Sequence, residues 1–231
     1  GTFDISLIRI SERSSLNKLY RIYGIEPPED DHSNRKLIEP QAIDGDGHLG
    51  GDDYDDELYK ELIRILGDTL RDKYPTKNYD LSTITSLDRK RLTKKVCNAK
   101  TDVYATHCLS VDVVLADGSH VDEVVRMSYQ NFYNAFLPIY TRTKKKTNNV
   151  LRECDCDVDT IILMGGSTKN PILVDMLSRD FPGFRINRTL DPDESVAKGA
   201  GIRARDFMYG DTSVQIFDIL PQSIGILSGD T

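Results

Sequence analysis

The stretch TIILMGGSTKNP, residues 160–171, decides how this chain is interpreted. Its apolar residues run into two glycines, and glycine reaches positive φ angles without strain, so the pattern predicts a buried strand that ends in a tight turn. A helix is expected next, because Pro171 is tolerated in a first helical turn and Thr168 or Asn170 can cap it. A strand, glycine turn and helix point free backbone N–H groups at whatever lies above them. The loop is therefore a candidate phosphate or nucleotide site, although similar turns also join strands to helices where no ligand binds.

Composition places the chain among ordinary globular proteins: 231 residues, 39% of them hydrophobic, with a net charge of -7. The length allows one large or two small domains. The negative charge argues against a general nucleic-acid binder. No apolar stretch approaches the roughly 18 residues of a membrane span, and the first residues lack the features of a signal peptide. We expect a cytoplasmic protein with neither nucleic acid nor membrane among its partners.

The cysteines are Cys97, Cys108, Cys154 and Cys156. They are too few and too scattered for a disulfide scaffold, so reduced thiols are expected. The alternative is a metal at the pair in ECDCDVD. Structural zinc needs four ligands at defined spacing, and the sequence offers no second pair of that kind.

Periodicity predicts the remaining elements. Residues 2–10 alternate like a half-buried strand with 16–25 as a hairpin partner, and 26–36 suits an exposed inserted loop. The other predicted elements are a helix in 56–74 with Leu58, Leu62, Ile65 and Leu66 on one face, a helix in 85–105 begun by Thr85 or Ser86, a hairpin in 108–128 turning at Asp117-Gly118, and helices in 129–146, 172–181 and 195–208. These elements imply an α/β or α+β domain with a mixed sheet and a helical and hairpin insertion.

The acidic segment DGDGHLGGDDYD, residues 44–55, partly matches a calcium-binding loop. Asp44, Asp46 and Asp55 fall at the first, third and twelfth positions of an EF-hand, but Leu49 stands where the sharp turn needs glycine. The segment therefore does not predict a calcium site. It is either a solvated acidic turn or a glycine turn that closes over a ligand.

Several motifs, in this order, resemble the seventy-kilodalton heat-shock chaperone family. GTFDIS at 1–6 resembles its second phosphate loop, GDGHLGGDDYD at 45–55 the following glycine-rich turn, LMGGSTKNP at 163–171 its adenosine motif and LDPDESVAKGAGIRA at 190–204 the closing helix of its ATPase domain. DILPQSIGIL at 218–227 is similar to the first strand of the family's peptide-binding domain.

The resemblance implies one lobe of an actin-like (ribonuclease H-like) ATPase: an α/β fold with a mixed sheet flanked by helices, plus an α+β insertion subdomain. Residues 1–51 and 131–212 would form the sheet-and-helix subdomain and 52–130 the insertion. Residues 213–217 would be the interdomain linker and 218–231 the start of the peptide-binding domain.

The resemblance also implies the site residues. Thr2 and Asp4 match catalytic positions beside the γ-phosphate and the metal-bound waters, and Gly1 would lend its N–H. The adenosine loop is matched by Gly166, Ser167 and Lys169, with lysine where the family usually has arginine, and the far edge of the pocket by Asp193. No residue is expected to bind a metal directly.

The helix expected to cover the adenine departs from the family pattern. Lys100 keeps its match, but Cys97 stands for a glutamate, Thr101 for an arginine and Tyr104 for a serine. Loss of one charged acceptor typically costs about 1–3 kcal/mol, so these changes are expected to weaken nucleotide binding. Tyr104 is a candidate to compensate by stacking.

The leading hypothesis is an ATP-dependent chaperone that binds ATP or ADP with Mg²⁺, takes unfolded peptides as clients, and works with co-chaperones and exchange factors in a stress response. The intact parent would be an ATP hydrolase, whereas this chain, lacking the family's earlier half and its catalytic lysine, is not expected to hydrolyse ATP. The alternatives are a divergent scaffold or assembly protein with weakened or lost nucleotide binding, and an unrelated sugar-kinase-like or actin-like domain.

Overall fold

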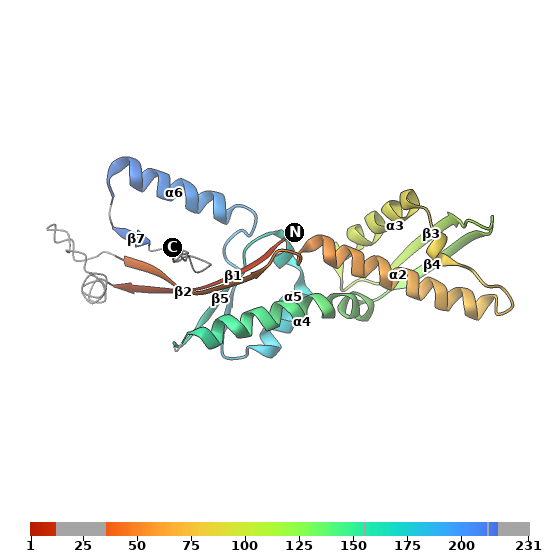
Figure 1. The fold of residues 1–231 in the computed structure, drawn as a ribbon, viewed down its shortest axis with the longest axis horizontal. Coiled ribbons are helices and arrows are strands. Elements are labelled where there is room, and N and C mark those ends of the chain that lie inside the picture. The colour runs from red at the N-terminus through yellow and green to blue at the C-terminus, as the bar shows by residue number, and fades with distance from the viewer. Residues whose placement is uncertain (13–35, 155, 212, 217–231) are drawn as a thin grey trace, which may run out of the picture. The chain divides into compact units, whose positions relative to one another are not determined.

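The computed structural model describes residues 1–12, 36–154, 156–211 and 213–216 (Figure 1). The chain divides into two compact units. Unit 1 contains residues 1–3, 47–144 and 158–193, and unit 2 contains the remainder. Strand β1 (Phe3–Glu12) and helix α4 (Tyr129–Glu153) each contribute residues to both units.

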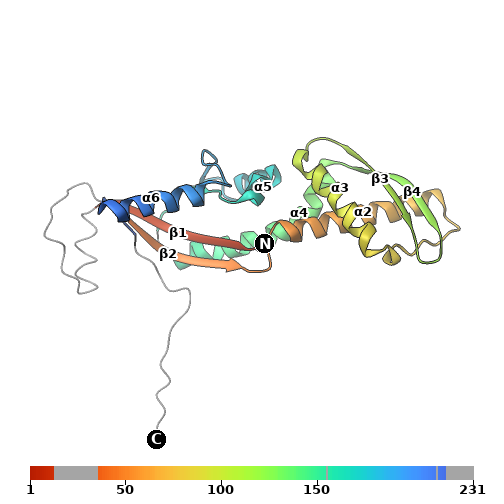
Figure 2. The same ribbon diagram turned by 90° about the horizontal axis from the view of Figure 1, so that it is seen from above.

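Within unit 1, two helices cover a β-hairpin. Helices α2 (Gly51–Lys73) and α3 (Ser86–Ala99) contact each other and the hairpin of β3 (His107–Val114) and β4 (His120–Met127), as Figures 1 and 2 show from two directions. The strands are antiparallel, with Val111 opposite Glu123. This group accounts for most of the segment expected to be an insertion.

The apolar stripes predicted for these helices form the core of the group. Leu58, Leu62 and Leu66 of α2 have 0% of their surface exposed, whereas Ile65 at the margin of the stripe is only half-buried. Burying each leucine stabilises the fold by about 1.5–3 kcal/mol. Core contributions from α3, the turn that follows it and the hairpin come from Leu92, Val96, Ala99, Val103, Val111, Val113, Val121, Val125 and Met127.

The predicted start of α3 and the predicted turn of the hairpin are confirmed, whereas α2 begins at Gly51, earlier than the predicted 56, and α4 ends at Glu153, later than the predicted 146. The Thr85 hydroxyl accepts from the backbone N–H of Asp88 and so caps α3, and Gly118 turns the hairpin with φ +83°. Helix α3 ends at Ala99, earlier than predicted, and continues as a short 3-10 turn, η3 (Lys100–Asp102). A second such turn, η2 (Leu81–Thr83), precedes α3.

The rest of unit 1 contains the opening stretch. Strand β5 (Thr160–Ile162) leads through η4 (Gly166–Lys169) to α5 (Pro171–Asp180), and β5 pairs in parallel with β6 (Arg185–Asn187). The predicted strand, glycine turn and helix are therefore confirmed. Helix α5 packs against α4 through Tyr140, whose hydroxyl donates to the Met176 carbonyl at 3.0 Å and to Asp180 at 2.8 Å.

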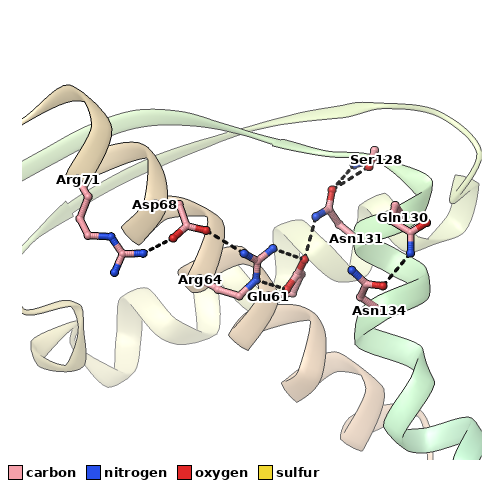
Figure 3. Close-up of polar contacts among 8 residues, drawn as sticks. All are labelled: Glu61, Arg64, Asp68, Arg71, Ser128, Gln130, Asn131 and Asn134. Carbon is pink, nitrogen blue, oxygen red and sulfur yellow. Dashed lines mark hydrogen bonds and ion pairs between the residues drawn. The ribbon is translucent and has the colours of Figure 1, made fainter.

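Figure 3 shows how α2 is tied to the first turn of α4. Glu61 is only 9% exposed, and its carboxylate accepts from Arg64 Nε at 2.7 Å and from Asn131 Nδ2 at 2.8 Å. The Asn131 side-chain oxygen in turn accepts from the backbone N–H of Ser128 at 2.9 Å. The network therefore fixes the residue at which α4 begins.

Unit 2 contains a sheet of strand order β1-β2-β7, in which β2 (Lys36–Asp46) runs parallel to β7 (Val214–Ile216). Helix α6 (Ser195–Tyr209) belongs to the same unit, and most of its surface is exposed, including Phe207 at 90%. Its C-terminal Gly210 takes the left-handed conformation with φ +65°.

One prediction about the cysteines is wrong. Cys154 and Cys156 are joined by a disulfide, whereas Cys97 and Cys108 are free thiols. With one residue between them, the two half-cystines have Cα atoms 5.3 Å apart, within the range that a disulfide spans. The sparse spacing of the cysteines along the chain therefore does not decide whether two neighbouring ones pair.

The mixed α/β class is confirmed, since helices occur with both parallel and antiparallel strand pairs. The predicted hairpin partner at 16–25, almost all of the loop at 26–36 and the predicted strand at 218–227 lie outside the described residues. Of the described helices, none combines the length and the apolar character needed to cross a membrane.

Candidate functional site

Three glycine turns of unit 1 lie against one another. A side chain at Gly50 would place its Cβ 2.6 Å from the Gly1 Cα and 2.8 Å from the Gly1 carbonyl carbon. A side chain at Gly51 would place its Cβ 3.1 Å from the Ser167 Oγ. The N-terminal turn, the start of α2 and the loop at 165–169 are therefore close neighbours, although the sequence separates them widely.

The loop of the opening stretch is fixed mostly by its own backbone. Gly165 has φ +86° and donates its N–H to the Pro192 carbonyl at 2.8 Å. Asn170 caps α5 by accepting from the Ile172 N–H at 3.0 Å. This geometry explains both the glycine at 165 and the asparagine before the proline.

Asp193 lies beside this loop and bonds to it. Its carboxylate forms an ion pair with Lys169, and a side chain at Gly166 would place its Cβ 3.4 Å from the Asp193 Oδ1. The structure therefore brings together all four residues predicted on the adenosine side, Gly166, Ser167, Lys169 and Asp193.

Lys100 is held by a residue that sequence reasoning missed. It forms an ion pair with Asp55 of α2 and lies 5.7 Å from the centroid of the Tyr54 ring. Burial, and then the Asp55 carboxylate, raises the pKa of the Cys97 thiol to about 11. The thiol is therefore neutral at pH 7, and the charge at this point comes from Asp55 rather than from position 97.

Tyr104 bridges three elements. Its ring stacks on Tyr129 at the start of α4, with centroids 5.6 Å apart, and its hydroxyl donates to Asp175 of α5 at 3.1 Å. Burial, and then the Asp175 carboxylate, raises the pKa of the Tyr104 hydroxyl, which stays protonated as a donor at neutral pH. The predicted stacking residue thus stacks on the protein itself.

These contacts close a ring within unit 1. Lys100 and Tyr104 lie four residues apart, and they reach helices α2 and α5 respectively. Gly51, the first residue of α2, in turn lies against Ser167 in η4, the turn that precedes α5. We call this set the contact ring: Gly51, Asp55, Lys100, Tyr104, Asp175 and Ser167.

The two predicted catalytic residues lie on successive parts of the N-terminal segment. Thr2 belongs to unit 1 with Gly1, while Asp4 belongs to unit 2 on strand β1. Thr101 lies in η3 and donates its hydroxyl to the Asn98 carbonyl at 2.8 Å. Within the part of the chain that the structure describes, no three Asp, Glu, His or Cys side chains gather as a metal-binding cluster.

Comparison with known proteins identifies the family. A family model described as Hsp70 protein matches residues 34–230. The chain belongs to the Hsp70 family. Among curated proteins, it is 29% identical over 219 residues to a chaperone protein HscA homolog of Burkholderia lata. The matched region covers 90% of this chain and 33% of the relative.

HscA homologs of Burkholderia orbicola and Burkholderia multivorans match with the same identity and coverage. The chain therefore spans about a third of the length of the curated Hsp70-family relatives that it matches.

Proposed function

We propose that this chain forms the second lobe of an actin-like nucleotide-binding domain of an ATP-dependent chaperone. Residues 1–51 and 131–212 would be its sheet-and-helix subdomain and 52–130 its insertion subdomain. The observation that carries the proposal is the close contact of the three glycine turns around Gly1, Gly50 and Ser167. Turns without side chains let backbone N–H groups approach the phosphates of a ligand closely.

Each residue has a role in this proposal. The Gly1 N–H and the Thr2 hydroxyl would face the γ-phosphate, and Asp4 would hold metal-bound water. On the adenosine side, Gly166, Ser167, Lys169 and Asp193 would meet Lys100 and Tyr104 from the insertion. When bound, ATP would supply the transferable phosphoryl group, and Mg²⁺ would neutralise its charge.

The residues present fit an adenine nucleotide. The start of α2 presents a helix N-terminus beside the Gly1 turn, which favours an anion, and the Gly50 N–H is itself occupied by Asp53 at 2.7 Å. Lys169 and Lys100 are each oriented by a carboxylate, which reduces the entropy lost when they meet a ligand.

Coupling to a peptide-binding domain is proposed through residues 213–217. Val214–Ile216 form β7, and the backbone N–H of Lys36 donates to the Ser213 carbonyl at 2.8 Å where β2 and β7 begin to pair. Strand β2 also neighbours β1, the strand that carries Asp4. A strand pairing of this kind supports a route by which a change at the phosphate turn reaches the linker, unfolded-peptide clients and co-chaperones.

The test uses the full-length protein, because this chain spans only about a third of the length of the relatives that it matches. ATP hydrolysis should fall at least about 10-fold in Thr2→Ala and in Asp4→Asn, the loss expected for groups that position reacting atoms. Ser110→Ala and Asp122→Asn, on the exposed face of the hairpin, are the matched controls. Equal rates in all five proteins would refute the enzymatic proposal, and this chain alone should not hydrolyse ATP.

The alternative is a divergent chaperone-like scaffold with weakened or lost nucleotide binding. The neutral Cys97 thiol favours it, because a thiol with a pKa of about 11 cannot replace the charge of the family's glutamate. Calorimetry of the full-length protein with ADP and Mg²⁺ separates the two. Absence of binding heat at millimolar ADP would favour the scaffold.

A further inference from the structure

A cluster of tyrosines lies where the turn after η3 meets the start of α4. Tyr104 and Tyr129 stack with an interplanar angle of 3°, and Tyr129 also contacts Tyr133, with centroids 6.2 Å apart. A parallel pair at 5.6 Å is within the range in which aromatic rings attract.

The Asp175 carboxylate accepts hydrogen bonds from two of these tyrosine hydroxyls. Asp175 Oδ2 accepts from Tyr104 at 3.1 Å and from Tyr129 at 3.4 Å. Asp175 is exposed, and Tyr104 keeps 63% of its surface exposed. Water therefore competes for these groups, so the bond from Tyr104 can open without uncovering any core.

The two partners of Tyr104, Tyr129 and Asp175, lie in packed helices, whereas Tyr104 lies in an exposed turn. Tyr129 is the first residue of α4, at the helix start that the Glu61 and Asn131 network holds to α2 (Figure 3). Asp175 precedes Met176, which is 0% exposed in the core under α5. An opening of the cluster therefore moves the turn that carries Tyr104 rather than either helix.

We propose that Tyr104 is a clasp that slows release of adenine nucleotide from this lobe. The inference rests on the proposed nucleotide-binding function. Tyr104 follows Lys100 by four residues and Asp175 follows Lys169 by six, so their bond joins the two segments proposed to hold the adenosine from opposite sides. While the bond is closed, those segments cannot separate on this side of the contact ring.

The test measures release of ADP carrying a fluorescent label on its ribose, displaced by excess ATP from the full-length protein. Tyr104→Phe keeps the stack and loses the hydroxyl, so release should be about 3- to 10-fold faster. Tyr104→Ser loses both contacts and should release about 10- to 30-fold faster. Tyr133→Phe is the matched control, because that hydroxyl accepts from Arg179 at 3.0 Å, and its release rate should be unchanged.

Hydrogen exchange without nucleotide provides a second measurement. The Ala105 N–H donates to the Asp102 carbonyl at 3.3 Å in the turn that Tyr104 anchors, so amides of 103–106 should exchange faster in Tyr104→Ser. Labelled ADP that binds and leaves all variants at the wild-type rate would overturn the clasp and leave the proposed function standing. A wild-type protein that binds no ADP would overturn both, even where the exchange difference shows the bridge to be present.

Discussion

Two parts of the contact ring are built differently: the glycine end, where Gly51 meets Ser167, and the tyrosine end, where Lys100 and Tyr104 meet Asp55 and Asp175. At the glycine end, Gly51 lies against Ser167, and the adjoining Gly50 lies against Gly1 with no room for a side chain on Gly50. At the tyrosine end, Lys100 and Tyr104 reach their partners by side chains that are partly exposed. Backbone contacts restrict which residue can be present, whereas side-chain contacts can be exchanged for others. The departures from the family pattern that the sequence resemblance implies at 97, 101 and 104 accordingly fall at or beside the second end.

The largest expected effect would come from breaking the glycine end. Gly50→Ala places a Cβ 2.6 Å from the Gly1 Cα, a distance that only a backbone shift can relieve. We expect the free energy of unfolding to fall by about 1–3 kcal/mol, the usual cost of overpacking. Urea denaturation of the full-length protein measures it.

Gly47→Ala is the control for that experiment, because a Cβ at Gly47 has nothing within 4 Å. If the contact between Gly50 and Gly1 sets the stability of this turn, the free energy of unfolding of Gly47→Ala should stay close to the wild-type value. Equal losses in both variants would mean that the turn as a whole, rather than its contact with Gly1, sets the stability.

A smaller effect is expected at the tyrosine end. Asp55→Asn removes the charge that orients Lys100, so affinity for ADP should fall about 5- to 10-fold. Loss of the same charge should lower the pKa of Cys97 from about 11, because Asp55 is one of the groups that raise it. Calorimetry gives the first quantity, and the pH dependence of thiol alkylation gives the second.

Asp56→Asn is the matched control, since the neighbouring Asp56 accepts from Arg89 at 3.1 Å on the exposed side of α2. This variant should change neither ADP affinity nor the alkylation profile. If Asp55→Asn alkylates like wild type, Asp55 does not act on Cys97, and the assignment of the missing charge to α2 is wrong.

Local patterns in the sequence predicted much of the fold. The stripe at Leu58 and Leu62, the cap at Thr85 and the turn at Gly118 each depend on residues within a few positions of one another. The resemblance named some residues at each end of the contact ring, Ser167 at one end and Lys100 and Tyr104 at the other. It did so because the family motifs at those residues are short and continuous.

The missed features join distant residues. Asp55 was considered only as a calcium ligand, because its pairing with Lys100 spans 45 residues and no local period reports it. The Tyr104 hydroxyl donates to Asp175 across 71 residues, a pairing that no local pattern in the sequence reports. Cys154 and Cys156 are the opposite case, since they pair across a separation of only two residues, which the number of cysteines in the chain does not indicate.

The smallest expected effect concerns Glu61, whose hydrogen bonds hold the start of α4, and with it Tyr129, to α2. Burial acts to raise the pKa of Glu61, but hydrogen bonds from Arg64 and Asn131 outweigh it and leave the pKa below the ordinary value. The ionised carboxylate therefore stabilises the fold above its unfolded pKa of about 4.3, and that stabilisation is lost as the pH falls through the lower folded value.

Glu61→Gln should cost about 1 kcal/mol at pH 7, a modest value because Arg64 is 55% exposed and its pairing is weakened by water. Between about pH 5 and pH 3 the stability of wild type should decline more steeply than that of the variant, so that the difference shrinks. Glu57→Gln, one turn earlier on α2, should keep the wild-type slope, because Glu57 pairs with Lys60 near the surface. Urea denaturation across this pH range measures all three proteins. If Glu61→Gln kept the wild-type slope, the start of α4 would not depend on Glu61, and the tyrosine end would lack the fixed base that lets Tyr104 move while Tyr129 stays.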